Sequence, residues 1–246
     1  MDYIEVSEAL HRPGLRLALT AGFPGPWSEA AKGIFKVKGI AYTAVRQRGG
    51  EKNEELLAWT RQNSAPCAVY ENERPRGGWA EILFLAERLQ PQPRLVPVDP
   101  RERALMFGLA HEICGEQGLG WTRRLTTGGA DRPQAPDTMG WKFGFNEAET
   151  MADAPRRINE ILALLSAQLQ AQRSAGSRFF VGAAMSAADI YWTTFSNMVR
   201  PLPPELSPMP PWLRKAFSQG DFTVDPVLIE HRDWMFDKHL GLPQDY

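Results

Sequence analysis

The alternation of apolar and polar positions separates a first part of the chain, which predicts strands and helices, from a second part, which predicts helices alone. Short alternating or apolar runs are typical of strands, and longer segments with apolar residues three and four positions apart are typical of amphipathic helices. Strands are predicted at 15–20, 41–45 and 67–70, and helices at 26–38, 51–59 and 79–89. The first strand, helix and second strand form a βαβ unit, so the first two strands should be parallel.

The second part follows a proline-rich segment at 91–97, which predicts a linker between domains. Segment 126–147 is rich in Gly, Pro and Trp and predicts a long loop. Apolar residues at helical spacing predict helices over 101–124, 155–173, 186–199, 211–217 and 226–239. We therefore expect an α/β domain over residues 1–90 and an all-α domain over 98–246.

Composition narrows the class of protein without naming an activity. With 28 Lys and Arg against 29 Asp and Glu, the net charge of -1 provides no global field for nucleic acid or an anionic membrane. No apolar run approaches the ~20 residues of a membrane helix, and the acidic N-terminus does not resemble a secretory signal. Two cysteines, Cys67 and Cys114, argue against a disulfide framework, and the dispersed histidines give no metal-ligand spacing. We expect a reduced, cytoplasmic protein that holds no metal.

Two short motifs carry the most information. Pro66 stands directly before an apolar strand, where it cannot donate to a sheet ladder, so the Ala65-Pro66 bond is a candidate cis peptide at a functional turn. Ser186-x-x-Asp189 can cap the start of a helix, and the flanking apolar residues Met185 and Ile190 could staple the entering chain.

Together these two segments resemble the glutathione S-transferase superfamily. The resemblance implies a thioredoxin-like α/β N-terminal domain followed by an all-α C-terminal domain, with Ser186 and Asp189 as a buried structural capping box. It also implies glutathione as co-substrate, a small hydrophobic electrophile as second substrate, and a homodimer. In the family, the residue before the cis-proline pairs through its main chain with the cysteinyl part of glutathione, which places Ala65 and Pro66 at the binding site.

The family's catalytic residue lies at the end of the first strand or just before the first helix. Residues 38–40, Lys-Gly-Ile, resemble the family's helix end, and counting back from them places Gly25-Pro26-Trp27-Ser28 over the family's Cys-Pro-Phe type of motif. The nucleophile position is then Gly25, and the tyrosine used by other classes falls near Ala21, so neither position can supply the usual group. Thr20 and Ser28 are the nearby hydroxyls that could donate to a glutathione thiolate, although a serine in a first helical turn is often a solvated or capping residue.

The family's Glu-Ser motif, which binds the γ-glutamyl carboxylate, is replaced here by Gly77-Gly78 or Gly78-Trp79. Backbone N–H groups at a helix N-terminus can still hold an anion after this replacement. The resemblance therefore implies a glutathione site formed largely by backbone. Its implied members are Gly25, Trp27, Ala65, Pro66, Gly78 and Trp79.

Segment 114–124 is unusual for a helix because its three glycines each cost about 1 kcal/mol relative to alanine. In the family this helix lines the hydrophobic-substrate pocket, so Trp121 could supply an aromatic wall, and Arg123 and Arg124 a fork for a carboxylate or phosphate. The alternative is tight helix packing with surface arginines. Cys67 likewise has two interpretations, a redox thiol or a small buried hydrophobe.

Two functions from different classes fit the sequence. The first is a glutathione-dependent transferase or thiol-transfer enzyme in which glutathione brings its own thiol and the protein lowers its pKa. The second is a binding or scaffolding protein that keeps the fold without the chemistry. A thioredoxin-type oxidoreductase is disfavoured because the sequence contains no Cys-x-x-Cys motif.

Overall fold

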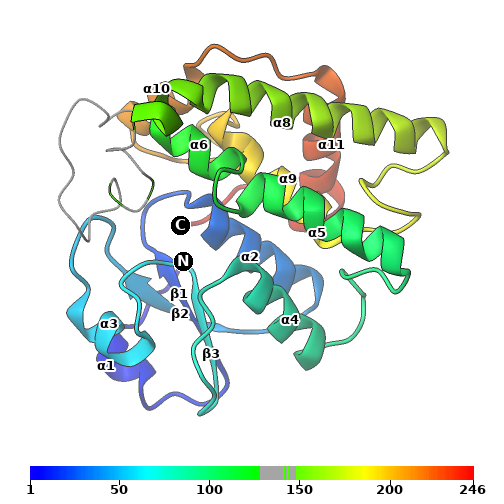
Figure 1. Cartoon of the computed structure of the whole chain (residues 1–246). Coiled ribbons are helices and arrows are strands. Elements are labelled where there is room, and N and C mark those ends of the chain that lie inside the picture. The colour runs from blue at the N-terminus through cyan, green and yellow to red at the C-terminus, as the bar shows by residue number, and fades with distance from the viewer. Residues whose placement is uncertain (128–140, 142, 144–147) are drawn as a thin grey trace. The chain divides into compact units, whose positions relative to one another are not determined.

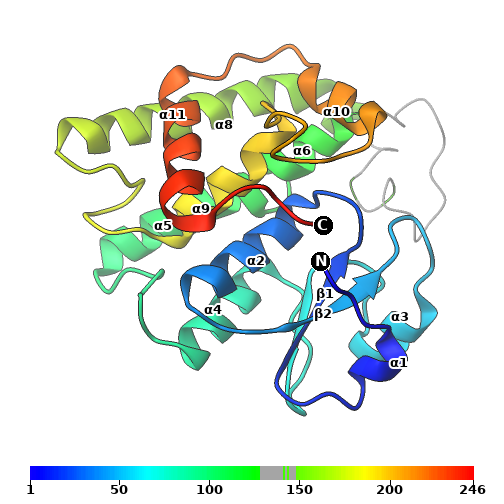
Figure 2. The same ribbon diagram turned by 180° about the vertical axis from the view of Figure 1, so that it is seen from behind.

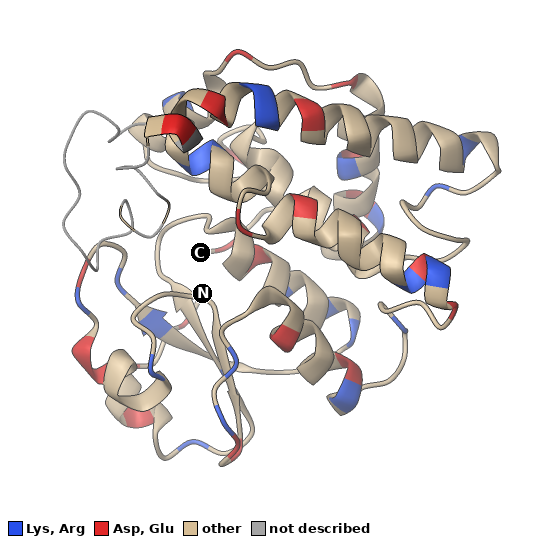
Figure 3. Cartoon of the chain, in the orientation of Figure 1, with Lys and Arg blue, Asp and Glu red and all other residues tan. Residues whose placement is uncertain are grey.

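The computed structural model describes residues 1–127, 141, 143 and 148–246, which form two compact units. Unit 1 comprises Met1–Arg94, Pro204–Met209 and Pro243–Tyr246. Unit 2 comprises Leu95–Pro203 and Pro210–Leu242. Both signs of charge occur along the helices of each unit (Figure 3). Within the described ranges, no helix has the length and apolar character that would let it cross a membrane.

Unit 1 contains a three-stranded sheet in the order β2-β1-β3 (Figure 1). Its strands are β1 (Leu15–Thr20), β2 (Thr43–Gln47) and β3 (Cys67–Tyr70). β1 and β2 are parallel, as the βαβ order predicted, and β3 is antiparallel to β1. β1 is nearly fully buried because it is the central strand, covered on both faces.

Four helices accompany this sheet. They are α1 (Val6–Ala9), α2 (Pro26–Val37), α3 (Glu54–Thr60) and α4 (Trp79–Leu89). Figure 1 shows α2 and α4 on one side of the sheet and α1 and α3 on the other. Pro26 at the first position of α2 fits the start that the sequence predicted. α3 begins three residues later than the predicted 51, after Asn53, whose φ of 49° places it in the left-handed region.

Unit 1 is completed by two segments from the far end of the chain, 204–209 and 243–246, which we call the returning segments. The Gln244 backbone N–H donates to the Leu206 carbonyl at 2.8 Å, and the hydroxyls of Ser207 and Tyr246 are 2.6 Å apart. The Gln244 side chain also reaches Glu29 of α2, with Nε2 3.4 Å from Oε2. The sequence did not predict these contacts, because they join residues between 38 and 215 positions apart.

Unit 2 is helical throughout its described part (Figures 1 and 2). Its helices are α5 (Pro100–Cys114), α6 (Leu119–Thr126), α8 (Ala148–Ser174), α9 (Ala187–Phe195), the 3-10 turn η1 (Ser196–Met198), α10 (Pro211–Ser218), α11 (Pro226–Met235) and the π-helical turn η2 (Phe236–Leu240). α5 packs on α9, α6 on α8, and α11 on both α8 and α9. The loop predicted for 126–147 falls mostly outside the described residues.

The single helix predicted over 101–124 is wrong, because α5 ends at Cys114 and α6 starts at Leu119. At Gly118 an added Cβ would lie 2.7 Å from the His111 carbonyl oxygen, and Gly115 is similarly crowded. Between them, Gln117 adopts a φ of 59°, in the left-handed region. The glycines therefore serve a sharp break between two helices, where the backbone passes too close for a side chain.

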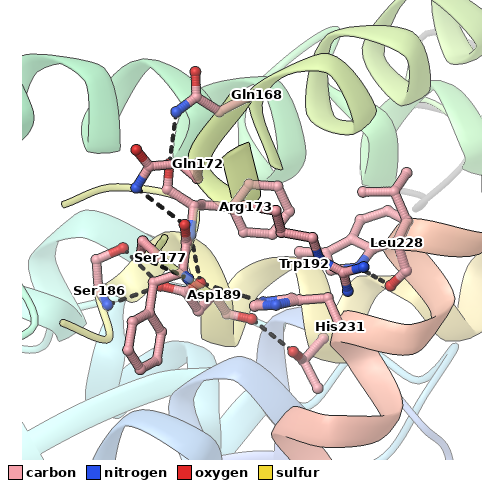
Figure 4. Close-up of polar contacts among 12 residues, drawn as sticks. Gln168, Gln172, Arg173, Ser177, Ser186, Asp189, Trp192, Leu228 and His231 are labelled. Carbon is pink, nitrogen blue, oxygen red and sulfur yellow. Dashed lines mark hydrogen bonds and ion pairs between the residues drawn. The ribbon is translucent and has the colours of Figure 1, made fainter. Parts of the chain in front are cut away.

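The buried capping box of α9 is present as predicted (Figure 4). Oδ2 of Asp189 accepts from the Ser186 backbone N–H at 2.8 Å and from its hydroxyl at 3.0 Å. Oδ1 accepts from the Phe180 N–H at 2.9 Å and lies 3.2 Å from Nε2 of His231 on α11. Asp189 therefore fixes both the start of α9 and the loop before it.

Candidate functional site

The end of β1 and the start of α2 bring three of the predicted site residues together. Gly25 is the N-cap of α2, and a Cβ added to it would lie 3.4 Å from Oγ of Ser28 and 4.0 Å from Oγ1 of Thr20. Both candidate hydroxyls thus border the position where the family's nucleophile would project. Since Gly25 has no side chain to cap the helix, the positive end of α2 is left for a ligand or for backbone contacts.

The two hydroxyls differ in what they can donate. Thr20 donates its proton to Oε1 of Gln47 at 2.8 Å, and Nε2 of Gln47 donates in turn to the carbonyls of Arg48 and Asn63. Ser28 is only 3% exposed, and its hydroxyl forms no hydrogen bond with any residue that the structure describes. The Ser28 proton is therefore the one available to a ligand. Gln47 was not among the predicted site residues; its signal in the sequence is a polar residue at the buried end of a strand.

The Ala65-Pro66 peptide bond is cis, as expected. Its turn is braced by Gln62, whose Nε2 donates to the carbonyls of Ser64 at 2.8 Å and Pro66 at 3.0 Å. Gln62 also explains why residue 77 is a glycine, because a Cβ at that position would lie 1.8 Å from Oε1 of Gln62. This role of Gln62 was not predicted from the sequence.

The N-terminus of α4 carries a carboxylate of its own. Gly78 is the N-cap, and its N–H donates to Oε2 of Glu81 at 3.2 Å. Oε1 of Glu81 accepts from Arg74 at 2.8 Å, and this hydrogen bond is the main reason why the pKa of Glu81 is lowered. The amide expected to hold a ligand carboxylate near Trp79 is therefore already bonded to a side chain of the same helix.

Cys67 lies in the centre of unit 1. It is 1% exposed, and burial raises the pKa of its thiol to about 11. A buried thiol with a raised pKa is a poor nucleophile, since the thiolate is the reactive form. The structure thus favours the small buried hydrophobe over the redox thiol.

In unit 2, the arginines on α6 face different surroundings. Arg123 is fully buried, and burial lowers its pKa to about 10. Its Nε donates to the Met198 carbonyl at 2.7 Å, and Nη2 donates to the carbonyls of Ala216, at 2.7 Å, and Gln219. The guanidinium of Arg123 is therefore used by main-chain carbonyls, including those at the end of α10. This differs from the prediction that Arg123 binds a carboxylate or phosphate of a ligand.

Arg124 has no such partners among the residues that the structure describes. Its guanidinium lies 6.0 Å from the ring centroid of Phe143, which packs edge-on against Trp121 at 4.7 Å. Its Nε is buried and forms no hydrogen bond within the described residues, and burial lowers its pKa to about 10. Of the two arginines, Arg124 is the one whose charge remains available beside an aromatic wall. No cluster of three or more His, Cys, Asp or Glu suited to a metal occurs in the described part of the chain.

The solved structures of other proteins identify this architecture. A glutathione S-transferase domain-containing protein from Marinobacter aquaeolei VT8 matches with a TM-score of 0.65 and 18% identity, over 91% of this chain and 98% of that one. The chain has the glutathione S-transferase fold. A bacterial Zeta-class glutathione S-transferase, maleyl pyruvate isomerase, matches with a TM-score of 0.62 and 18% identity, over 90% and 92% of the two chains.

A third match to this fold is a glutathione transferase homologue from Sulfitobacter with bound glutathione, with a TM-score of 0.58 and 18% identity over 92% and 94% of the two chains. No protein-family model matches the sequence, and no curated protein does. The chain therefore shares the glutathione S-transferase fold with proteins that are less than 25% identical to it.

Proposed function

We propose that this protein is a glutathione-dependent transferase that joins the glutathione sulfur to a small hydrophobic electrophile. The observation that carries the proposal is the convergence of the Ser28 hydroxyl on the Gly25 position at the start of α2. A similar fold crystallised with glutathione supports glutathione as the ligand. The missing side-chain nucleophile is no obstacle, because glutathione supplies the thiol.

In this mechanism the thiol of bound glutathione loses its proton to water. The positive end of α2 and the Ser28 hydroxyl, which donates a hydrogen bond to the sulfur, stabilise the thiolate and so lower the thiol pKa. The thiolate then attacks the electrophile, forming a sulfur–carbon bond while the leaving group departs with the electron pair of the broken bond. Ala65 pairs with the cysteinyl backbone of glutathione beside the Pro66 turn.

The side-chain carboxylate of Glu81 competes with the carboxylate end of glutathione for the Gly78 amide. Glu81 occupies the Gly78 amide, so the ligand carboxylate must displace it and approach Arg74. We infer that glutathione binds more weakly here than it would to an uncapped helix end. Glu81→Gln should then tighten glutathione binding, since removing the charge weakens the competing contact and leaves the Gly78 amide in place.

Selectivity toward the second substrate is assigned to unit 2. Arg124 forms no ion pair within the described residues and lies beside the ring of Phe143, which packs on Trp121; this suits an electrophile that combines an apolar body with an acidic group. Arg124→Met should therefore reduce turnover of acidic electrophiles more than of neutral ones. We also propose that the protein acts in the cytoplasm as a homodimer, which sedimentation at micromolar concentration would test.

The deciding experiment combines two measurements on the purified protein. Retention on immobilised glutathione, together with turnover of 1-chloro-2,4-dinitrobenzene and of an acidic analogue, supports the transferase. A protein that neither binds glutathione nor turns over either substrate would contradict it. Glutathione binding without turnover would instead favour the second candidate, a binding or scaffolding protein. The glycine at position 25, where the family has its catalytic residue, supports this candidate.

A further inference from the structure

Unit 2 contains a pocket that plays no part in the proposed transferase chemistry. It is open to solvent, has a volume of about 490 Å³, and lies where the end of α8 and the loop after it meet α11. Ligand pockets in proteins are usually about 300–1,000 Å³, so this one is large enough for a small organic molecule. The side chains that define its chemistry are Arg173, Arg178, Glu230, His231 and Trp234.

The rim of the pocket carries an excess of positive charge. Arg173 pairs with Glu230 at 2.8 Å, but both side chains are exposed, and such surface pairs contribute little to stability. Arg178 forms no ion pair within the described residues, and its guanidinium lies 4.9 Å from the ring centroid of Trp234. Two guanidiniums therefore face one carboxylate, and a ligand anion could replace Glu230 as the partner of Arg173.

A buried histidine also lines the pocket. His231 is 1% exposed, and its Nε2 forms no hydrogen bond within the described residues although it lies 3.2 Å from Oδ1 of Asp189 (Figure 4). The same Oδ1 accepts from the Phe180 N–H, and Oδ2 accepts from Ser186. His231 therefore connects the wall of the pocket to the capping box of α9.

The wall next to the arginines is aromatic. Trp234 lies 5.4 Å from Phe179, 5.8 Å from His231 and 5.1 Å from His239, measured between ring centroids. These rings give the pocket an apolar side, and its volume far exceeds that of an inorganic ion. A ligand that fits both features has a charged end and a flat apolar body.

We propose that this pocket binds a small organic anion, with a carboxylate or phosphate group held between Arg173 and Arg178 and an aromatic or similarly flat body against Trp234. The site is independent of glutathione, because none of its residues belongs to the proposed transferase site. Through His231 it adjoins Asp189, so an occupied pocket should stabilise the loop that ends at the α9 cap.

Four probes separate the two parts of the proposal, measured by calorimetry at fixed ionic strength. Benzoate and phenyl phosphate carry both a negative charge and an aromatic ring. Benzamide carries the ring without the charge, and inorganic phosphate carries the charge without the ring. We expect at least one of the first two to bind about ten times more tightly than benzamide and than inorganic phosphate, a difference of about 1.4 kcal/mol. The tighter of the two identifies the anionic group.

Variants locate the site. Arg173→Met with Arg178→Met should weaken binding about tenfold or more, whereas Arg156→Met, an exposed and ion-paired arginine on the same helix, should leave it unchanged. Replacing both arginines with lysine should restore part of the affinity, which distinguishes lost charge from lost folding. Benzamide binding as tightly as both benzoate and phenyl phosphate, no binding of either aromatic anion by the wild type, or undiminished binding by the methionine variant would overturn the proposal.

Discussion

The hydroxyl of Thr20 donates to Oε1 of Gln47 at 2.8 Å. This bond distinguishes Thr20 from Ser28, whose hydroxyl also lies beside the start of α2. Gln47 is itself held by two backbone carbonyls, so it presents its oxygen to Thr20 and cannot easily turn away. The proton of Thr20 is thus committed to the protein, and that of Ser28 is not.

The first prediction follows from this difference. Ser28→Ala should lower kcat about 10- to 100-fold and change glutathione affinity little, because a hydrogen bond to a developing charge matters most during the reaction. Thr20→Val should leave kcat nearly unchanged but reduce the free energy of unfolding by about 1 kcal/mol, since Oε1 of Gln47 loses its donor. Steady-state kinetics and urea unfolding of both variants test this. Reversed roles, with Thr20→Val the slower enzyme, would contradict it.

The second prediction concerns the two arginines of α6. Arg123→Met should cost about 3 kcal/mol of unfolding free energy or more, because it leaves the buried Met198 carbonyl and the part-buried Ala216 carbonyl at the end of α10 without this donor. Arg124→Met should cost less than about 1 kcal/mol, since no hydrogen bond within the described residues is lost. Chemical denaturation of the matched pair measures both. Similar losses in the two variants would show that Arg123 is not the structural residue that its bonds indicate.

The third prediction tests the capping box of α9. Asp189→Ala should destabilise unit 2 by about 3 kcal/mol, because the buried N–H groups of Ser186 and Phe180 both lose their acceptor. Ser186→Ala should cost only about 1 kcal/mol, because the backbone N–H keeps its bond to the carboxylate. Thermal melts and urea unfolding check the order of the two effects. If both variants have the same melting temperature as the wild type, the capping box does not stabilise the fold.

The fourth prediction is a pH dependence at Glu29, a buried carboxylate on α2 next to Lys32 and Gln244. Burial is the largest cause of its shift and raises its pKa above the ordinary value of 4.5, whereas Lys32 opposes the shift. A raised folded-state pKa means that the contribution of Glu29 to stability is fully present below pH 4.5 and is lost as pH rises through the folded pKa.

Glu29→Gln should therefore be more stable than the wild type at pH 8, with a gap that closes as the pH falls toward 4.5. Unfolding free energies measured by urea between these limits give the curve. Glu160→Gln, which alters an exposed carboxylate paired with Arg156, is the control and should leave the pH dependence unchanged. A wild type and Glu29→Gln variant with parallel pH profiles would rule out a raised pKa at this site.

Much of the fold could be predicted because it depends on local patterns. The apolar runs placed β1, β3 and α4 at the observed residues, and the Ser186-x-x-Asp189 spacing identified a buried cap. α1 was missed because four residues are too few to establish a helical period. The helix break after Cys114 was missed because crowding at Gly115 and Gly118 depends on how the backbone turns back toward His111.

The candidate site was less predictable because its chemistry depends on partners distant in sequence. The resemblance to the glutathione S-transferase superfamily implied that Thr20 and Ser28 lie near Gly25, but not that Gln47 accepts the proton of Thr20. Arg123 and Arg124 are neighbours in sequence with equal charge, yet one reaches carbonyls 75 to 96 residues away and the other does not. Such differences arise only when the helices pack.

The returning segments also determine when unit 1 can be finished during synthesis. The strands and helices of residues 1–94 leave the ribosome first, but Gln244 and Tyr246, which contact Glu29, Ser207 and Lys32, emerge only after all of unit 2 has been translated. Until unit 2 has been synthesised, Glu29 and Lys32 on α2 therefore lack their contacts with Gln244 and Tyr246. A fragment that stops at Arg94 would correspond to this nascent intermediate.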